Sequence, residues 1–192
     1  PNPLGIVYAA PGNHARCTTS GSRFSQREID IIAQLEEMQV IREGIGADEK
    51  DPSGDFVVGL VTPFRAQAKS LGERIRADLS GGHARWLAET AHKFQGRGAD
   101  TVILSTVLNA DDSSAAREFY DCDAMANVIV SRAKNRLIVV TTHGGVRHSR
   151  NIRSLLEYIT MYDPASIVDS DIVSIFDVLY DAYSDSLKRY AR

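Results

Sequence analysis

Residues suited to binding phosphate are concentrated in three segments of this sequence. They read GLVTPFRAQ (Gly59–Gln67), TAHKFQGRGADTVILS (Thr90–Ser105) and NVIVSRAKNRLIVV (Asn127–Val140). Hydroxyl and imidazole groups donate hydrogen bonds to phosphate oxygens without reading a base sequence, and a glycine lets the backbone approach a phosphate closely. Basic residues outnumber acidic ones between Thr62 and Asp100, so the overall net charge of −3 does not exclude an anionic ligand.

Motifs that would complete an active site within one chain are missing from the sequence. It has no GxxxxGK(S/T) phosphate loop and no GxGxxG, HExxH, GxSxG or EF-hand pattern. Cys17 and Cys122 lie far apart without a CxxC pair, which is typical of reduced, non-catalytic thiols. Metal-ligand spacing is absent from the histidines, which are His14, His83, His92, His143 and His148. We therefore expect the chain to supply part of a site, without a metal.

In order and spacing, the three segments resemble motifs IV, V and VI of superfamily 1 helicases. The similarity is to the branch with the nonsense-decay and Okazaki-maturation helicases, whose motifs read like GIITPYxxQ, TVHxFQGxExDxVI and NVAxTRAK. It covers about Phe56 to Val140. This resemblance implies the second RecA-like motor domain, called 2A, of an ATP-driven translocase on single-stranded DNA or RNA. An N-terminal RecA-like domain of the same parent chain would carry the phosphate loop and the acidic Mg²⁺-binding motif.

By this resemblance, ATP would lie between the two motor domains and this chain would supply half of its site. Arg132 matches the arginine finger, whose charge stabilises the γ-phosphate during phosphoryl transfer; the alternative is a surface arginine in an ordinary ion pair. A second arginine of many relatives would fall near Arg27, and Arg23 is another candidate. Gln95 and Gly96 match residues that sense the nucleotide state, and the alternative for Gly96 is a plain turn. We expect no ATPase activity from the isolated chain.

The same resemblance implies a site for single-stranded nucleic acid. Phe64 can stack on a base and Arg65 can neutralise a phosphate, although Phe64 is equally consistent with a core residue at a strand end. Thr90 and His92 match positions that contact the nucleic-acid backbone, and the alternative for His92 is a structural histidine. The expected nucleic-acid-binding set is Thr62, Pro63, Phe64, Arg65, Thr90 and His92.

Two departures from the family pattern favour an alternative function. Gly98 replaces a glutamate that is thought to meet the nucleotide ribose, and Met125 stands where many relatives are basic. A degenerate, non-catalytic helicase-like domain, acting as a scaffold or regulatory module, is therefore the second hypothesis. A small-molecule enzyme on a doubly wound sheet is a third, but no catalytic constellation in the sequence supports it.

Alternating strands and helices must position these motifs. Apolar runs predict buried strands at 6–10, 56–61, 101–107 and 136–142. Apolar residues at helical spacing predict helices at about 25–41, 68–79 and 152–159, the first of which starts at the capping-box sequence SQRE. The NVIV segment at 127–130 is consistent with either a strand or a helix. Together these elements predict an α/β fold with a mostly parallel, helix-covered sheet and ligands beyond the carboxyl ends of the strands.

Composition and length agree with one folded domain and an appendage. The 192 residues are 43% hydrophobic and 24% charged. Neither a membrane-length apolar run nor a signal peptide is present, so we expect a cytoplasmic protein. The chain starts without methionine, and we expect a fragment with a RecA-like 2A domain at 1–145 and a helical C-terminal extension at 146–192. An apolar stripe at 172–190 predicts a last helix, packed on the domain or leading to another one.

Overall fold

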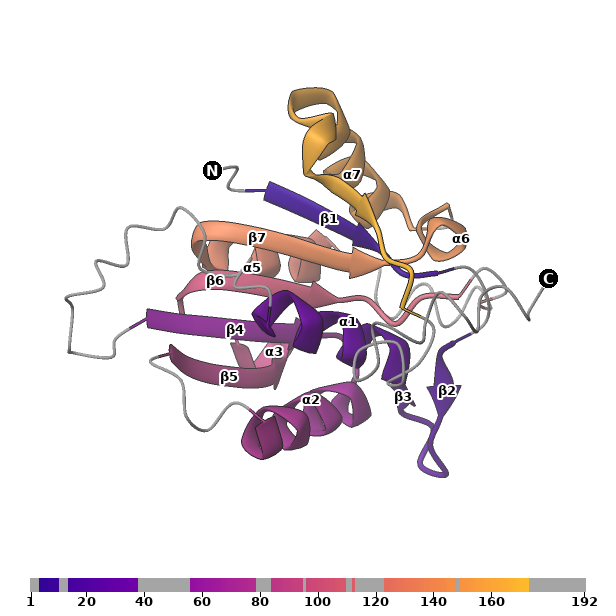
Figure 1. Ribbon diagram of the computed structural model, residues 1–192, viewed down its shortest axis with the longest axis vertical. Helices are drawn as coiled ribbons and strands as arrows, with labels where there is room; N and C mark the ends of the chain where they lie inside the picture. Colours follow the sequence, from indigo (N-terminus) through magenta and orange to yellow (C-terminus); the bar gives the residue numbers. More distant parts are fainter. Residues whose placement is uncertain are drawn as a thin grey trace.

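A sheet of parallel strands forms the centre of the computed structural model (Figure 1). The structure describes residues 4–10, 14–37, 56–78, 84–94, 96–109, 112, 123–147 and 149–172. Across this part of the chain the strand order is β5-β4-β6-β7-β1-β8, and all neighbouring pairs are parallel. The strands are Leu4–Tyr8 (β1), Phe56–Thr62 (β4), Ala84–Thr90 (β5), Ala99–Ser105 (β6), Ala133–Thr141 (β7) and Ile167–Asp169 (β8). An antiparallel pair, Arg16–Cys17 (β2) and Arg23–Phe24 (β3), lies apart from the sheet.

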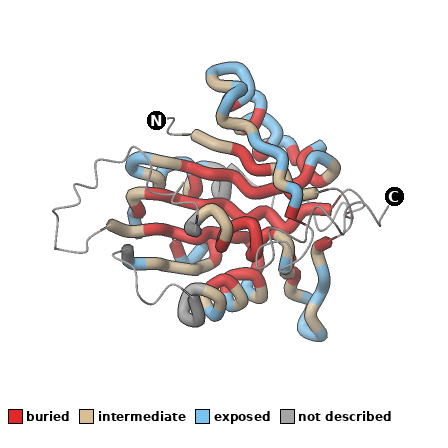
Figure 2. The backbone as a smooth tube through the Cα atoms, in the orientation of Figure 1, coloured by how far each residue is buried: buried red, intermediate tan, exposed pale blue. Residues whose placement is uncertain are grey.

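Helices cover both faces of this sheet, which confirms the predicted α/β class. Residues of one strand alternate between the faces, so Val58 of β4 packs with α1 and α2, whereas Val61 packs with α3, α5 and α7. The strand centres are the most buried part of the backbone (Figure 2). The helices are Gln26–Glu37 (α1), Arg65–Asp78 (α2), Ala91–Phe94 (α3), Asp123–Arg132 (α5), His143–Val146 (α6) and Arg150–Tyr162 (α7).

A glycine in β4 makes room for the short crossover between β5 and β6. The chain returns across the sheet through α3, and the Phe94 side chain at its end is fully buried. A Cβ atom built on Gly59 would lie 2.4 Å from Cζ of Phe94 and 3.1 Å from Cβ of Ala99. Real Cβ atoms do not approach other atoms so closely, so the crossover requires glycine at this position.

The structure resolves the ambiguous segment and adds to the central sheet two strands that the sequence pattern does not predict. NVIV at 127–130 belongs to helix α5. Strand β5, with the sequence ARWLAET, carries charged residues and lies at one edge of the sheet. Strand β8 is only three residues long and pairs with β1 at the other edge. Both edge strands lack the continuous apolar run that identifies a strand buried on both faces.

Residues 146–172, which we expected in a helical extension, pack on the sheet in the structure. Val146, Ile152, Leu156 and Ile159 join the same buried cluster as β6 and β7, and β8 extends the sheet itself. The amphipathic stripe beyond Ile172 lies outside the described residues. The domain boundary at 145 therefore stays a prediction.

Replacing Gly59 by alanine tests the close approach of α3 to β4. We expect Gly59→Ala to lower the free energy of unfolding by about 1–3 kcal/mol, because the added methyl group overpacks the core against Phe94. Gly72→Ala is the matched control: Gly72 lies on α2, its Cβ would lie at an ordinary distance of 3.7 Å from Cβ of Ala88 on β5, and helix propensity favours alanine there. Urea denaturation of the three proteins measures the difference. Equal stability of Gly59→Ala and wild type would contradict the packing argument.

Candidate functional site

Parallel strands place the motif residues at two opposite edges of the sheet. At the carboxyl edge, where the strands end, Thr62 of β4 pairs with Thr90 of β5. At the amino edge, where the strands begin, Ala99 of β6 pairs with Ala133 of β7. We call the end of the sheet where the parallel strands finish the carboxyl edge, and the end where they start the amino edge; both differ from the sides of the sheet formed by the edge strands β5 and β8. The carboxyl edge and the amino edge lie at the right and left of Figure 1, respectively.

Two of the expected nucleic-acid-binding residues present their side chains at the surface of the carboxyl edge. Arg65 begins α2 directly after the TPF turn and is exposed. His92 lies on α3 and is also exposed. Thr62, Pro63 and Thr90 are buried, and the Thr62 hydroxyl accepts a hydrogen bond from the Phe64 backbone N–H. Only Arg65 and His92 of this set can therefore offer side-chain donors to a ligand in this arrangement.

The Phe64 ring is part of the hydrophobic core. It is 7% exposed and packs in the cluster formed with Val61 and Phe94. The guanidinium of Arg23 lies 5.5 Å from the ring centroid, a distance typical of a cation–π contact. The structure thus favours the core alternative for Phe64 over stacking on a base.

The amino edge brings the last motif next to the second one. Arg132 is the final residue of α5 and directly precedes β7. A Cβ atom on Gly98 would lie 3.3 Å from Cε of Lys134 and 4.0 Å from the Arg132 carbonyl oxygen. Asp100 accepts a hydrogen bond from the Val57 N–H at 2.8 Å and forms an ion pair with Lys134 at 3.6 Å. Motifs V and VI therefore meet at this edge.

Arg132 is half-buried and offers an unused donor. Its Nε atom is buried and has no hydrogen-bond partner among the residues that the structure describes. A buried guanidinium N–H without an acceptor is costly, and an anionic ligand would satisfy it. The exposed Gly96 has a φ of +85°, a left-handed conformation that glycine adopts without strain. Gln95, expected beside it, lies outside the described residues.

The structure does not bring Arg27 to Arg132. The Nη1 atom of Arg27 donates to the Ala10 carbonyl at 2.8 Å, just beyond the end of β1. Tyr8 of β1 pairs with Thr141 at the end of β7, whereas Arg132 precedes the start of β7. A nine-residue strand spans roughly 30 Å, so Arg27 belongs to the other edge. Arg27 and Arg132 therefore belong to opposite ends of the strands, and the expected catalytic roles of both residues stay predictions.

Arg23, the other arginine considered for that role, is also committed elsewhere. Its Nη2 atom lies 2.6 Å from a carboxylate oxygen of Asp112. Both side chains are nearly buried. This ion pair and the contact with Phe64 give Arg23 a structural environment at the carboxyl edge.

A buried polar network joins α1, α2 and β6 at the carboxyl edge. Ser25 begins α1 as expected, with its Oγ atom accepting from the Glu28 N–H at 3.2 Å. In a capping box the glutamate would return to the Ser25 N–H, but that donor is taken by Oε1 of Gln67 at 2.8 Å. Glu28 instead accepts from the Ser105 hydroxyl at 2.6 Å, and Ser105 accepts from Nε2 of Gln67 at 2.8 Å.

Glu28 also holds the turn that follows β6. The Val107 N–H donates to both carboxylate oxygens of Glu28, at 3.0 and 3.1 Å. Val107 has a φ of +54°, which is strained for a β-branched residue. Fixed acceptors on this N–H stabilise the strained turn. The capping-box pattern gave the position of the helix start, but no local pattern indicates that Glu28 contacts a residue so far along the chain.

The family model for AAA domains named AAA_12 matches residues 2–144, about three quarters of the chain. The chain belongs to this AAA domain family. The match includes all three motifs and both edges of the sheet described above. The predicted resemblance to a RecA-like domain of superfamily 1 helicases is confirmed.

Two kinds of known proteins resemble this AAA domain. The DNA replication ATP-dependent helicase/nuclease DNA2 of Gallus gallus is 30% identical over 99 residues, which are 52% of this chain and 10% of that protein. The C-terminal domain of a possible DNA helicase from Lactobacillus plantarum WCFS1 has a TM-score of 0.46 at 14% identity, covering 88% of this chain and 85% of the other. The large terminase of bacteriophage HK97 has a TM-score of 0.46 at 11% identity, covering 88% and 35%.

The described part of the AAA domain contains no cluster of three or more His, Cys, Asp or Glu side chains that could hold a metal ion. Among those same residues, no helix is both long and apolar enough to span a membrane. Cys17 is a free, exposed thiol on β2, and Cys122 lies outside the described residues.

Burial shifts two titratable groups of the network in opposite directions. The pKa of Glu28 is raised to about 7, mainly because the carboxylate is fully buried, while the hydrogen bonds from Ser105 and Val107 oppose the shift. The pKa of His14 is lowered to about 4, mainly by burial and further by Arg27 and Arg23. Nδ1 of His14 lies 2.6 Å from Oγ of Ser25, so the two groups flank the same serine. At neutral pH His14 is uncharged.

These two shifts predict opposing pH effects on the stability of the AAA domain. Glu28 keeps its proton in the folded state up to about pH 7, whereas in the unfolded state it loses the proton near pH 4.5. Its contribution to the free energy of unfolding is therefore present at low pH and is lost as the pH rises from about 4.5 to 7. His14 stays neutral in the folded state, so its contribution is lost as the pH falls from about 6.5 to 4. Between about pH 4.5 and 6.5 the two effects offset each other.

Removing one of the two titratable groups should make the pH dependence of stability that the other group causes measurable by itself. In Glu28→Gln only the His14 effect remains, and we expect stability to fall between pH 6.5 and 4.5 more steeply than in wild type, by at most about 1.4 kcal/mol per pH unit. Thermal unfolding at several pH values measures this slope. Glu73→Gln, which changes an exposed residue on α2, is the control and should keep the wild-type slope. Identical slopes for all three proteins would contradict the opposing pKa shifts.

Proposed function

We propose that this AAA domain is the second motor domain, 2A, of an ATP-dependent superfamily 1 helicase. The observation that supports it most is the half-buried Arg132 with an unpartnered Nε atom beside the Gly96–Gly98 turn. An arginine at a domain edge can stabilise a polyphosphate that is held mainly by another domain. The motif resemblance and the relative named as a DNA replication helicase/nuclease support the same function.

ATP is the nucleotide of this proposal, and an arginine beside a glycine turn at the amino edge supports the binding of its phosphates. Arg132 would contact the γ-phosphate, and the backbone around Gly96 can approach the nucleotide closely because no side chain stands in the way. ATP supplies the phosphoanhydride bond whose hydrolysis drives movement. Arg132 would offset the negative charge that redistributes during transfer, and its place as the last residue of α5 puts it at the amino edge. We expect the Mg²⁺ ligands on the N-terminal RecA-like domain of the parent chain.

The carboxyl edge is the proposed contact for single-stranded DNA or RNA. Arg65 at the start of α2 and His92 on α3 each present an exposed donor, and such groups bind phosphate oxygens without base specificity. Nucleotide and strand would thus lie at opposite ends of the same strands. Closure of the two motor domains on ATP would then displace the strand-binding edge relative to the first domain.

A non-catalytic scaffold is the second candidate function. Gly98 favours a scaffold. It has no side chain that could contact a nucleotide, and the neighbouring Lys134 is already paired with Asp100 at the amino edge. A scaffold keeps the fold without turnover. The two candidates differ in whether the parent protein hydrolyses ATP, which the next experiment measures.

Removing the guanidinium of Arg132 tests the motor. In the full-length parent we expect Arg132→Ala to lower strand-stimulated ATPase turnover by about 10³- to 10⁵-fold, as loss of an arginine finger does. Arg153→Ala removes an exposed charge from α7 and should keep the wild-type rate. Steady-state phosphate release measures both. No turnover by the wild-type parent favours the scaffold, equal turnover by wild type and Arg132→Ala rejects the finger, and turnover by the isolated domain rejects the whole proposal.

Removing Arg65 tests the strand contact. We expect Arg65→Ala to weaken binding of the parent to single-stranded oligonucleotides and to reduce the slope of log K against log salt by about 0.7, the value for one phosphate contact. Lys69→Ala, one turn further along α2 and paired with Glu73, is the control. Fluorescence anisotropy over a series of salt concentrations measures the slope. An unchanged slope in Arg65→Ala would place the strand elsewhere.

A further inference from the structure

Glu28 is a fully buried carboxylate that the proposed motor chemistry does not use. Burying such a group is costly unless donors surround it. Its donors, the Ser105 hydroxyl and the Val107 N–H, belong to the carboxyl end of β6 and the turn beyond it. A carboxylate in the first turn of α1 thus ties that helix to the exit of β6.

The same network reaches the start of α2. The Ser105 hydroxyl accepts from Nε2 of Gln67, and the side-chain oxygen Oε1 of Gln67 accepts from the Ser25 N–H. The neighbouring Ala66 N–H donates to the Ser22 hydroxyl at 3.0 Å. The first turn of α2, which carries Arg65, is therefore held by residues of the segment that leads into α1.

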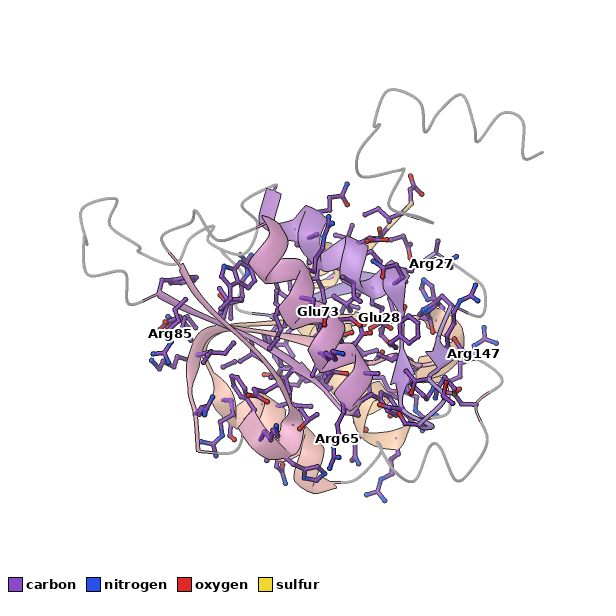
Figure 3. All side chains as sticks on the ribbon, turned by 90° about the horizontal axis from the view of Figure 1, so that it is seen from below. Arg27, Glu28, Arg65, Glu73, Arg85 and Arg147 are labelled. Atoms are coloured by element: carbon purple, nitrogen blue, oxygen red, sulfur yellow. The ribbon has the colours of Figure 1, made fainter. Side chains whose placement is uncertain are left out.

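Glu28 and Arg65 belong to this edge, whereas Arg85 lies far from it. Figure 3 shows Arg27 and Arg147 on one side of the molecule, with Glu28 and Arg65 nearer the centre and Arg85 on the opposite side. Glu73 lies further along α2 and is exposed to solvent. Among the residues that the structure describes, Glu73 forms an i,i+4 pair with Lys69 at 3.8 Å and no bond to the Glu28 network, so it offers a carboxylate outside that network.

We propose that Glu28 is a positioning residue for strand binding, which fixes α1, the start of α2 and the turn after β6 as one rigid unit beneath Arg65. The inference rests on the proposed function of the carboxyl edge. Glutamine is a poor substitute for Glu28, because an amide has one acceptor oxygen, whereas both carboxylate oxygens accept here. In Glu28→Gln the amide NH₂ replaces one of these two oxygens and faces the Val107 N–H, which donates to both oxygens in the wild type, so the strained turn loses part of its support.

The test separates positioning from simple loss of folded protein. ATPase turnover of the full-length parent is titrated with oligo-dT and with oligo-U at pH 8, where Glu28 is ionised. We expect Glu28→Gln to raise the half-stimulating strand concentration roughly tenfold, as a small misplacement of binding groups does, with turnover at saturating strand changed less than twofold. Glu73→Gln should match wild type in both values.

Two results would overturn the inference. One is a half-stimulating concentration equal to wild type in Glu28→Gln. The other is reduced turnover at saturation with an unchanged half-stimulating concentration, which indicates only fewer active molecules. If Glu28→Gln does not fold, Ser105→Ala decides by the same criteria, because it removes the hydroxyl that joins Glu28 to Gln67.

If the proposed strand-binding function is wrong, the wild-type parent itself gives a different result in this titration. A wild-type parent that neither strand stimulates contradicts strand binding by this domain. Amide hydrogen exchange then tests the positioning unit by itself. We expect faster exchange at Ala66 and Val107 in Glu28→Gln than in Glu73→Gln, and equal exchange in the two variants would overturn the rigid unit.

Discussion

A carboxylate that is buried away from water needs hydrogen-bond donors around it. The donors of Glu28 hold several segments together at the carboxyl edge of this domain. Its partners come from the end of β6 and from the turn beyond it, which no local sequence rule would bring to the first turn of α1. Ser105 and Gln67 extend the set to α2. Because an unsatisfied member would cost more than an apolar replacement, these segments keep one mutual arrangement. The start of α2, which carries Arg65, and the turn after β6 take their places from that arrangement.

The direction of the strands separates the two groups of residues that we propose for binding nucleotide and nucleic acid. Helix α5 leads into β7 without a loop, so Arg132 comes to the amino edge, beside the turn that precedes β6. Helix α2 follows β4, so Arg65 comes to the carboxyl edge. Both facts follow from chain order in a parallel sheet. A single α/β domain can therefore present one ligand at each end of its strands without sharing side chains between them.

The sequence predicts the elements whose signals are local. The apolar runs of β4, β6 and β7 identify strands covered on both faces, and the SQRE pattern locates the start of α1. Edge strand β5 escapes this reasoning because its charged residues interrupt the pattern. The β-branched NVIV segment is helical in α5, where packing overrides propensity. The candidate site is harder to predict from the sequence, because it depends on contacts between distant parts of the chain. Such contacts decide the burial of Phe64, the separation of Arg27 from Arg132 and the partners of Glu28.

Strand β6 begins one residue after Gly98 and ends at Ser105, with hydrogen-bonded neighbours on both sides. A strand in the middle of a sheet cannot stretch or shorten without breaking those bonds, so it behaves as a strut of fixed length. A displacement of the turn beside Arg132 would pass to the Glu28 network along the part of the strand that is paired on both sides, from Thr101 to Leu104. Mechanical communication between the two ends of the domain then requires no rearrangement of its core, only movement of the sheet as a whole.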